Sequence, residues 1–274
     1  MLPVDAPAGW RAYRAGMNRA ETGRSRDVEM VGAPPTARPE PGLSKVYVGV
    51  PRLALPTVSP PSVGLGDLLE GRASCRRFGG EPMTLHELAV LLHSAYGVFS
   101  ECVGLTGMLK DRPVPSGGAR FPLELYVVVR RLDGVPAGVH HVAPRPPGEV
   151  SFLEQLRGPV PWPRMVRLFL DQPYLEPVDA LVVITGVSSR TLKRYGERGA
   201  RFLWLESGHV AQNLTLAATA LGLGSLPLAG FFDEPLAALL GVDPQVEPPL
   251  YAVALGRPTT QDRRLARLPP ASGG

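Results

Sequence analysis

Apolar residues recur at helical spacing in the stretch that follows Met83. Thr84 and Glu87 have the spacing of a capping box, and Gly97 follows the last apolar position. The apolar stripe between these signals consists of Leu85, Leu88, Leu91, Leu92 and Ala95. The pattern predicts an amphipathic helix that begins after Thr84 and stops at Gly97.

Other parts of the chain alternate between helical and strand patterns. A short helix is expected from Leu65, and longer helical patterns occupy 163–171, 198–221 and 234–240, with Asp233 as the expected N-cap of the last. Short runs rich in Val, Tyr and Ile, bounded by Gly or Pro, predict buried strands at 123–130, 180–186 and 250–256. Strands interleaved with helices favour an α+β or α/β layer architecture.

Both ends of the chain lack this periodicity. Residues 1–44 are rich in proline and predict an irregular arm. The run "KVYVGV" (45–50) is apolar and β-branched, so it could pair at a sheet edge before Pro51 stops it. We therefore expect one globular domain over 45–260, followed by an irregular tail over 261–274.

Composition and charge exclude several classes of protein. The chain has 274 residues, 44% hydrophobic and 20% charged, which is enough to bury a large core. Its net charge of +4 is spread along the sequence, which argues against a nucleic-acid-binding protein. The longest apolar run, 201–225, carries Glu206, His209, Gln212 and Asn213, which argues against a membrane span.

Cysteine and histidine give no sign of a disulfide framework or a metal centre. Cys75 and Cys102 are the two cysteines, without metal-ligand spacing. His140 and His141 are adjacent, so on a strand they would face opposite sides. The N-terminus has charges and prolines where a signal peptide needs an apolar segment. A cytoplasmic location is expected.

The predicted helix over 198–221 carries an unusual polar stripe. Glu206, His209 and Asn213 share one face of a helix that is otherwise mostly apolar, as expected in a core or at a subunit interface. A buried polar group without a partner costs about 1–3 kcal/mol. Either these groups bond to neighbouring backbone or they serve a ligand. Gly222 can then adopt a left-handed conformation that ends the helix, and "GLGS" could let backbone approach a flat ligand.

Three further segments could bind a ligand. In "RASCRRF", Arg72, Ser74 and Arg76 alternate, so in an extended chain they would point the same way and could grip a phosphate. The other interpretation of this segment is a solvated basic turn. "RPVPSGGARF" forms a loop with accessible backbone at Ser116 before a buried strand, and "LGRP" delivers Arg257 into a loop.

In this order, the segments resemble the nitroreductase superfamily, and within it the SagB-type dehydrogenases that include the azoline oxidases. The resemblance covers roughly residues 45–258. It implies an α+β, three-layer α/β/α fold with a mainly antiparallel central sheet and a long central interface helix. It also implies a homodimer with FMN at the subunit interface. The residues that would bind this cofactor are Arg72, Ser74, Arg76, Pro115, Ser116, Gly117, Gln212, Gly224, Ser225, Leu226 and Arg257.

The resemblance also implies a reaction. Azoline oxidases convert thiazoline or oxazoline rings of a peptide into azoles, by moving a hydride to FMN and removing a proton with a base. Oxidising members of the family carry a Lys-Tyr pair before "GERG", whereas this chain has Lys193, Arg194 and Tyr195. Arginine does not release its proton under ordinary conditions. Either Lys193 takes the place of the family's lysine from a shifted position, or Arg194 holds an anionic group of the substrate while Tyr195 handles the proton.

The sequence is also compatible with other functions. The chain could be an NAD(P)H-dependent reductase of nitro or quinone compounds, or a non-catalytic subunit of a peptide-modifying complex. Residues 193–198 could also be no more than a charged helix start.

Overall fold

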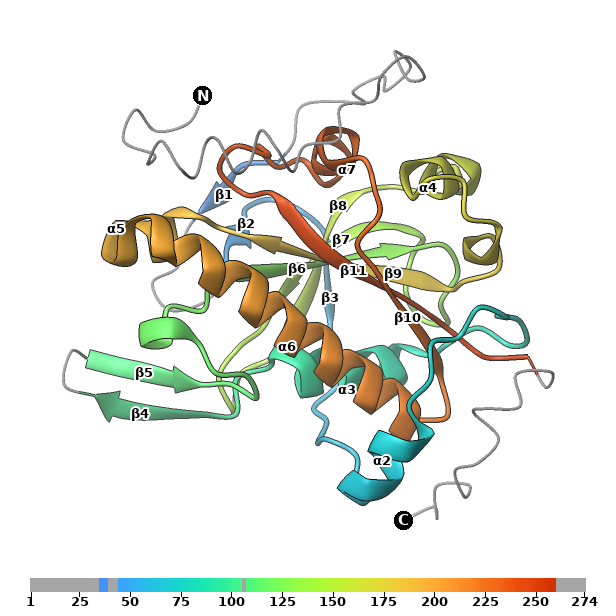
Figure 1. Ribbon diagram of the computed structural model, residues 1–274, viewed down its shortest axis with the longest axis horizontal. Coiled ribbons are helices and arrows are strands. Elements are labelled where there is room, and N and C mark those ends of the chain that lie inside the picture. Colours follow the sequence, from blue (N-terminus) through green and yellow to red (C-terminus); the bar gives the residue numbers. More distant parts are fainter. Residues whose placement is uncertain (1–34, 39–43, 105–106, 260–274) are drawn as a thin grey trace.

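The computed structural model describes residues 35–38, 44–104 and 107–259. Its centre is a seven-stranded sheet in the order β10-β11-β9-β6-β7-β8-β3, shown in Figure 1. Every neighbouring pair of strands is antiparallel. The strands are β3 (Arg52–Ala54), β6 (Leu123–Val129), β7 (Gly138–Ala143), β8 (Phe152–Arg157), β9 (Ala180–Gly186), β10 (Gly224–Leu228) and β11 (Pro249–Gly256).

The central strands are buried on both faces because helices cover each side of the sheet. Along β6, Leu125 and Val127 face a core shared with α3 (Leu85–Tyr96) and α6 (Gly199–Ala220). Tyr126 and Val128 face the opposite core, shared with α4 (Trp162–Leu168) and α7 (Asp233–Leu240). Alternate side chains of a strand point to opposite faces, so a continuous apolar run supplies both cores. This confirms the expected α+β fold of helices, sheet and helices.

The predicted helices are present, with differences at their ends. The capping box of α3 is formed, since the Glu87 amide donates to Thr84 Oγ1 at 3.2 Å and the Thr84 amide donates to Glu87 Oε2 at 2.8 Å. Asp233 is already helical, and Phe232 occupies the N-cap position instead. The helix expected over 163–171 ends at Leu168, because Leu170 and Asp171 take left-handed φ values of 62° and 55°.

Smaller elements surround this frame. They are β1 (Ala37–Arg38), β2 (Val46–Tyr47), α2 (Leu65–Gly71), the hairpin of β4 (Ser100–Gly104) and β5 (Gly107–Asp111), α5 (Ser189–Tyr195), and the 3-10 turns η1 (Gly117–Ala119), η2 (Pro173–Leu175) and η3 (Gly196–Arg198). In the part of the chain that the structure describes, no helix is long and apolar enough to cross a membrane.

The strand expected in residues 45–50 is present, but it does not lie at the edge of the main sheet. Within "KVYVGV", β2 pairs with β1 in a separate two-stranded ribbon, and it is β3, after Pro51, that forms the edge of the main sheet. The strand β1 also lies inside the arm that was expected to be irregular. The rest of that arm, apart from residues 35–38 and Ser44, and the tail over 261–274 lie outside the described residues.

Candidate functional site

The arginine-rich segment lies in extended conformation beside β10. Ser74 and Ser225 form a parallel bridge, and the Cys75 amide donates to the Ser225 carbonyl at 2.9 Å. Cys75 is fully buried, whereas Ser74 and Arg76 are exposed. The alternation expected from the sequence is therefore present over residues 74–76, while Arg72 is half-buried at the end of α2. The bridge to Ser225 brings this segment against the start of β10.

Two cations of this segment suit a phosphate. Arg72 is half-buried and Arg76 is exposed, and among the described residues neither guanidinium has a carboxylate or hydrogen-bond partner. Guanidinium groups and a serine hydroxyl on one side of a strand are the donors that a phosphate monoester prefers. We refer to Arg72, Ser74, Arg76 and β10 as the phosphate half-site.

Arg257 reaches this half-site but is already paired. Its carbonyl accepts from the Gly79 amide at 2.9 Å, which holds the chain beside the 72–80 segment. Its guanidinium donates to both carboxylate oxygens of Glu87, at 2.9 and 3.1 Å. The ion pair fixes the end of β11 against the start of α3. Because the Glu87 carboxylate also neutralises part of the Arg257 charge, the role of Arg257 as a second phosphate cation stays a prediction.

The loop at Ser116 lies against a different part of the molecule. A methyl group on Gly117 would come within 2.9 Å of the Phe202 ring, and Gly118, at a φ of 62°, faces the Tyr195 hydroxyl. The rings of Tyr195 and Phe202 meet edge to face at 4.9 Å. We refer to Ser116, Gly117, Gly118, Tyr195 and Phe202 as the ring half-site.

The other predicted residues near this loop are placed as follows. Arg194 lies over the Tyr195 ring, at 5.8 Å from its centroid, next to Gly118. Lys193 is exposed on α5, and Pro115 is exposed at the start of the loop. Helix α5 ends at Tyr195, where Gly196 takes a φ of 56°, so the view of 193–198 as a helix start is wrong.

The two half-sites lie at opposite ends of α6. Figure 1 shows α5, which ends at Tyr195, at one end of this helix and α2, which leads into the 72–76 segment, at the other end. From Phe202 to Ala220 the helix axis rises about 27 Å, at about 1.5 Å a residue. Gln212 is exposed on the face between them. A flavin mononucleotide joins its ring to its phosphate by a five-carbon chain, which is too short for this separation. One protomer therefore does not surround a single FMN with both half-sites.

The polar stripe of α6 divides into three environments. Glu206 is 2% exposed, His209 is exposed, and the Asn213 amide donates to the Pro113 carbonyl at 3.2 Å. Glu206 Oε1 accepts from the Tyr96 hydroxyl at 2.8 Å. The sequence pattern singled out Glu206 but not Tyr96, because the two lie 110 residues apart.

An apolar side chain is also exposed on α6. Leu205 is 61% exposed, so it is available for contact with a partner surface.

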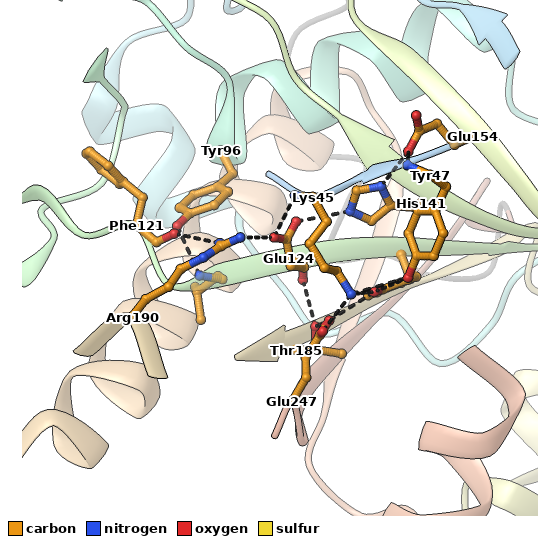
Figure 2. A network of polar contacts seen from close by, with 12 residues as sticks. Lys45, Tyr47, Tyr96, Phe121, Glu124, His141, Glu154, Thr185, Arg190 and Glu247 are labelled. Atoms are coloured by element: carbon orange, nitrogen blue, oxygen red, sulfur yellow. Dashed lines mark hydrogen bonds and ion pairs between the residues drawn. The ribbon is translucent and has the colours of Figure 1, made fainter. Parts of the chain in front are cut away.

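A buried network of ionic groups connects α5 to the sheet, as Figure 2 shows. Arg190 of α5 donates to Glu124 Oε1 at 2.5 Å, and His141 contacts Glu124 and Glu154 through its two ring nitrogens, each at 3.0 Å. The Lys45 ammonium donates to Glu247 at 2.6 Å and to Tyr126 at 2.7 Å. Nothing in the sequence pattern indicated this network.

The network holds α5 in place. Arg190 stands one turn before Arg194, and it also donates to the Phe121 carbonyl at 3.1 Å. Burial alone would raise the pKa of Glu124, but the charge of Arg190 and the hydrogen bond and charge of His141 lower it to about 2. Glu124 is therefore ionised near neutral pH at the centre of the network, and it ties the helix that carries Tyr195 to the sheet.

His141 gives the network a measurable pH dependence. Burial alone would lower the pKa of His141, but the hydrogen bonds that its ring makes to the Glu124 and Glu154 carboxylates outweigh burial and raise it. A raised pKa means that the stabilisation is complete below the unfolded value, about 6.5, and is lost as pH rises through the folded value.

We expect wild type to exceed His141→Gln in free energy of unfolding at pH 6, and we expect this difference to shrink toward pH 9. Denaturant titrations of both proteins at several pH values measure it. A difference that stays constant or grows with pH would show that His141 is neutral in the folded protein.

Comparisons with known proteins place this chain in a known family. A family model described as the nitroreductase family matches residues 69–257. A Methanocaldococcus jannaschii protein whose name assigns it to the nitroreductases is 36% identical over 195 residues, which are 71% of this chain and 91% of that protein. The chain belongs to the nitroreductase family, whose members are generally flavin-dependent oxidoreductases.

Two relatives are named for peptide processing. The trifolitoxin-processing protein TfxB of Rhizobium leguminosarum bv. trifolii is 30% identical over 154 residues, and the microcin B17-processing protein McbC of Escherichia coli is 28% identical over 154 residues. The matches cover 56% and 53% of this chain, but only 41% of TfxB and 54% of McbC.

Solved structures share the fold. A crystal structure from Anabaena variabilis, also named as a nitroreductase, superposes with a TM-score of 0.60 at 26% identity, over 84% of this chain and 44% of that chain. A chain of the E. coli microcin synthetase McbBCD complex superposes with a TM-score of 0.57 at 24% identity, over 69% of this chain and 70% of that chain.

Proposed function

We propose that this chain is an FMN-dependent oxidoreductase of the SagB type, which moves a hydride between a substrate and FMN. The observation that carries the proposal is the presence of two complementary half-sites at the two ends of α6. One offers unpaired arginines suited to the phosphate of FMN, and the other offers small residues and aromatic rings suited to a flat ring.

A homodimer would complete the site. If α6 crosses its copy about a two-fold axis, the phosphate half-site of one chain meets the ring half-site of the other. Such a contact is isologous, so it would form two equal FMN sites at once. The exposed Leu205 on α6 supports a contact along this helix.

The favoured substrate is a peptide that carries an azoline ring. The support is the similarity to TfxB and McbC, which are named for the processing of trifolitoxin and microcin B17. In the oxidation, one ring carbon gives up a hydride to FMN, the neighbouring carbon loses a proton, and the azoline becomes an azole. The chain could act within a complex of peptide-modifying proteins, as the McbBCD name suggests for the E. coli proteins.

A visible absorption spectrum of the purified protein tests the cofactor. Stoichiometric FMN, identified after release from the protein, is the expected result. A colourless protein that also fails to bind added FMN would remove the basis for the enzyme, and the non-catalytic subunit would then be the better interpretation.

Mixing two damaged chains tests whether each site spans two protomers. Arg72→Ala/Arg76→Ala damages the phosphate half-site, and Gly117→Val damages the ring half-site because a larger side chain meets Phe202. Each variant alone should lack turnover. An equal mixture refolded together should recover about a quarter of the wild-type sites, since half of randomly formed dimers are mixed and each has one intact site. Activity that stays at zero in verified mixed dimers would contradict shared sites.

A second activity is favoured by the M. jannaschii relative and by Arg194. That relative is named as a nitroreductase, and an arginine stands where the azoline oxidases have a lysine. A nitro or quinone reductase would oxidise NADPH or NADH in the steady state, whereas an azoline oxidase that returns its electrons to oxygen would be indifferent to nicotinamide. Nicotinamide oxidation with a quinone present separates these two activities.

A further inference from the structure

The carboxyl group of Glu206 has an unusual position for a charged side chain. It is 2% exposed on α6, one helical turn after Phe202 of the ring half-site. Its Oε1 accepts from the Tyr96 hydroxyl at 2.8 Å, but its Oε2 is buried and has no hydrogen-bond partner among the described residues. Buried polar atoms are rarely left in this state, so the second oxygen calls for an explanation.

Ser116 connects this carboxyl group to the ring half-site. Its hydroxyl accepts from the Phe121 amide at 2.8 Å and is close enough to Glu206 to lower the pKa of the carboxyl, although it makes no standard hydrogen bond to Oε2. A serine hydroxyl rotates freely, and it can donate on one side while it accepts on the other. Ser116 can therefore pass a proton between the loop and Glu206.

The surroundings leave Glu206 able to take and release a proton near neutrality. Burial raises its pKa to about 7, against the opposing effects of Ser116, Tyr96, Arg112 and Arg190. These groups come from the loop, from α3, from the segment after β5 and from α5, and the next titratable side chain of α6, His209, is exposed. A general acid or base works best when its pKa is close to the operating pH.

The residues that family members would use for the proton are less suited here. Arg194 does not release its proton, and Lys193 is exposed on α5. Tyr195 faces Gly118 and Phe202 within the ring half-site, where it can orient a substrate. In the described part of the chain, Glu206 is the buried acid next to this half-site.

We infer that Glu206 is the proton acceptor and donor of the site, reached through the hydroxyl of Ser116. This inference rests on the proposed function. FMN bound at this site would supply the hydride chemistry. In an oxidation, a substrate carbon would lose a hydride to it, the proton lost by the neighbouring carbon would move to Ser116 Oγ, and the serine proton would move to Glu206 Oε2. In the reduction of a quinone, Glu206 would supply through Ser116 the proton that accompanies the hydride, which yields the hydroquinone.

The experiment follows reoxidation of the FMN-loaded protein by menadione, after reduction with one equivalent of dithionite. In wild type the reoxidation rate should fall as pH rises through 7, because Glu206 loses its proton. Glu206→Gln keeps an acceptor for the Tyr96 hydroxyl but carries no acidic proton. It should bind FMN as wild type does, react 10²-fold or more slowly, and show no dependence on pH near 7.

A second variant and a second readout keep the test decisive. Ser116→Ala interrupts the path but keeps the Glu206 side chain and its contact with Tyr96, and it should slow reoxidation to a similar extent. Infrared spectra of the flavin-free protein should show the carbonyl band of one protonated carboxylic acid that disappears near pH 7 and is missing in Glu206→Gln. This band reports on Glu206 whether or not FMN binds.

The outcomes separate this inference from the proposed function. If the wild-type protein does not bind FMN, both the proposed function and this inference are overturned. The role of Glu206 alone would be overturned if the wild-type protein binds FMN and either Glu206→Gln or Ser116→Ala reacts at the wild-type rate with the wild-type pH profile. An infrared band that titrates well below neutrality would overturn it as well.

Discussion

The Arg72→Ala/Arg76→Ala protein is expected to bind FMN about 10²–10⁴-fold more weakly than wild type. A hydrogen bond to a charged group contributes about 1.5–3 kcal/mol, and each arginine would lose at least one such bond to the phosphate. Neither side chain has a carboxylate partner among the described residues, so their removal should leave the free energy of unfolding of the flavin-free protein almost unchanged. Fluorescence titration of the flavin-free protein with FMN measures the affinity.

Arg77→Ala is the matched control for this experiment. Arg77 is the next residue of the same segment, it is exposed, and its contacts to Cys75 and to Thr259 use its backbone carbonyl. The substitution removes one positive charge from the same surface without touching the proposed phosphate donors. If Arg77→Ala weakens FMN binding as much as the double variant does, the loss of affinity comes from the general surface charge, and the assignment of the phosphate half-site is wrong.

Glu124→Ala should lower the free energy of unfolding by about 3–5 kcal/mol. Removing one partner of a buried ion pair leaves the other charges uncompensated. Glu124 accepts hydrogen bonds from Arg190 and from the Lys45 amide, and it also contacts His141. For a chain of this size the melting temperature should fall by roughly 10 °C. Thermal and denaturant unfolding of the FMN-loaded and flavin-free proteins measure the change.

Glu70→Ala is the control for this change. Glu70 is exposed on α2, so its removal should alter stability by less than about 0.5 kcal/mol. A Glu124→Ala protein as stable as Glu70→Ala would show that the buried network contributes nothing net. Loss of turnover at a temperature where Glu124→Ala is still folded would show in addition that Arg190 positions α5.

Local patterns were sufficient to predict the frame of the molecule. The capping box and apolar stripe of α3 and the apolar runs of β6, β9 and β11 are regular, so each element follows from its own sequence. The alternation around Cys75 also predicted that Ser74 and Arg76 are exposed, although Arg72 is half-buried. These features depend on neighbours within a few residues.

The elements that escaped prediction depend on distant partners. Strands β7 and β8 carry His140, His141, Glu154 and Gln155, which are not typical of buried strands. Three of these polar side chains are buried, and His141 and Glu154 face Glu124 and Arg52 from other parts of the chain. Lys45 meets Glu247 across 202 residues. Because such pairs have no local periodicity, they become visible only when the chain is folded.

The position of Arg257 also has a consequence for synthesis of the protein. The 72–80 segment is held by Ser225 of β10 and by Arg257 after β11, and Arg257 in turn holds the Glu87 cap of α3. A growing chain emerges from the ribosome in sequence order, so the 72–80 segment cannot take its final position until Ser225 and Arg257 have been synthesised. The proposed phosphate half-site therefore forms only after nearly the whole domain has been translated, and FMN would be captured after synthesis instead of during it.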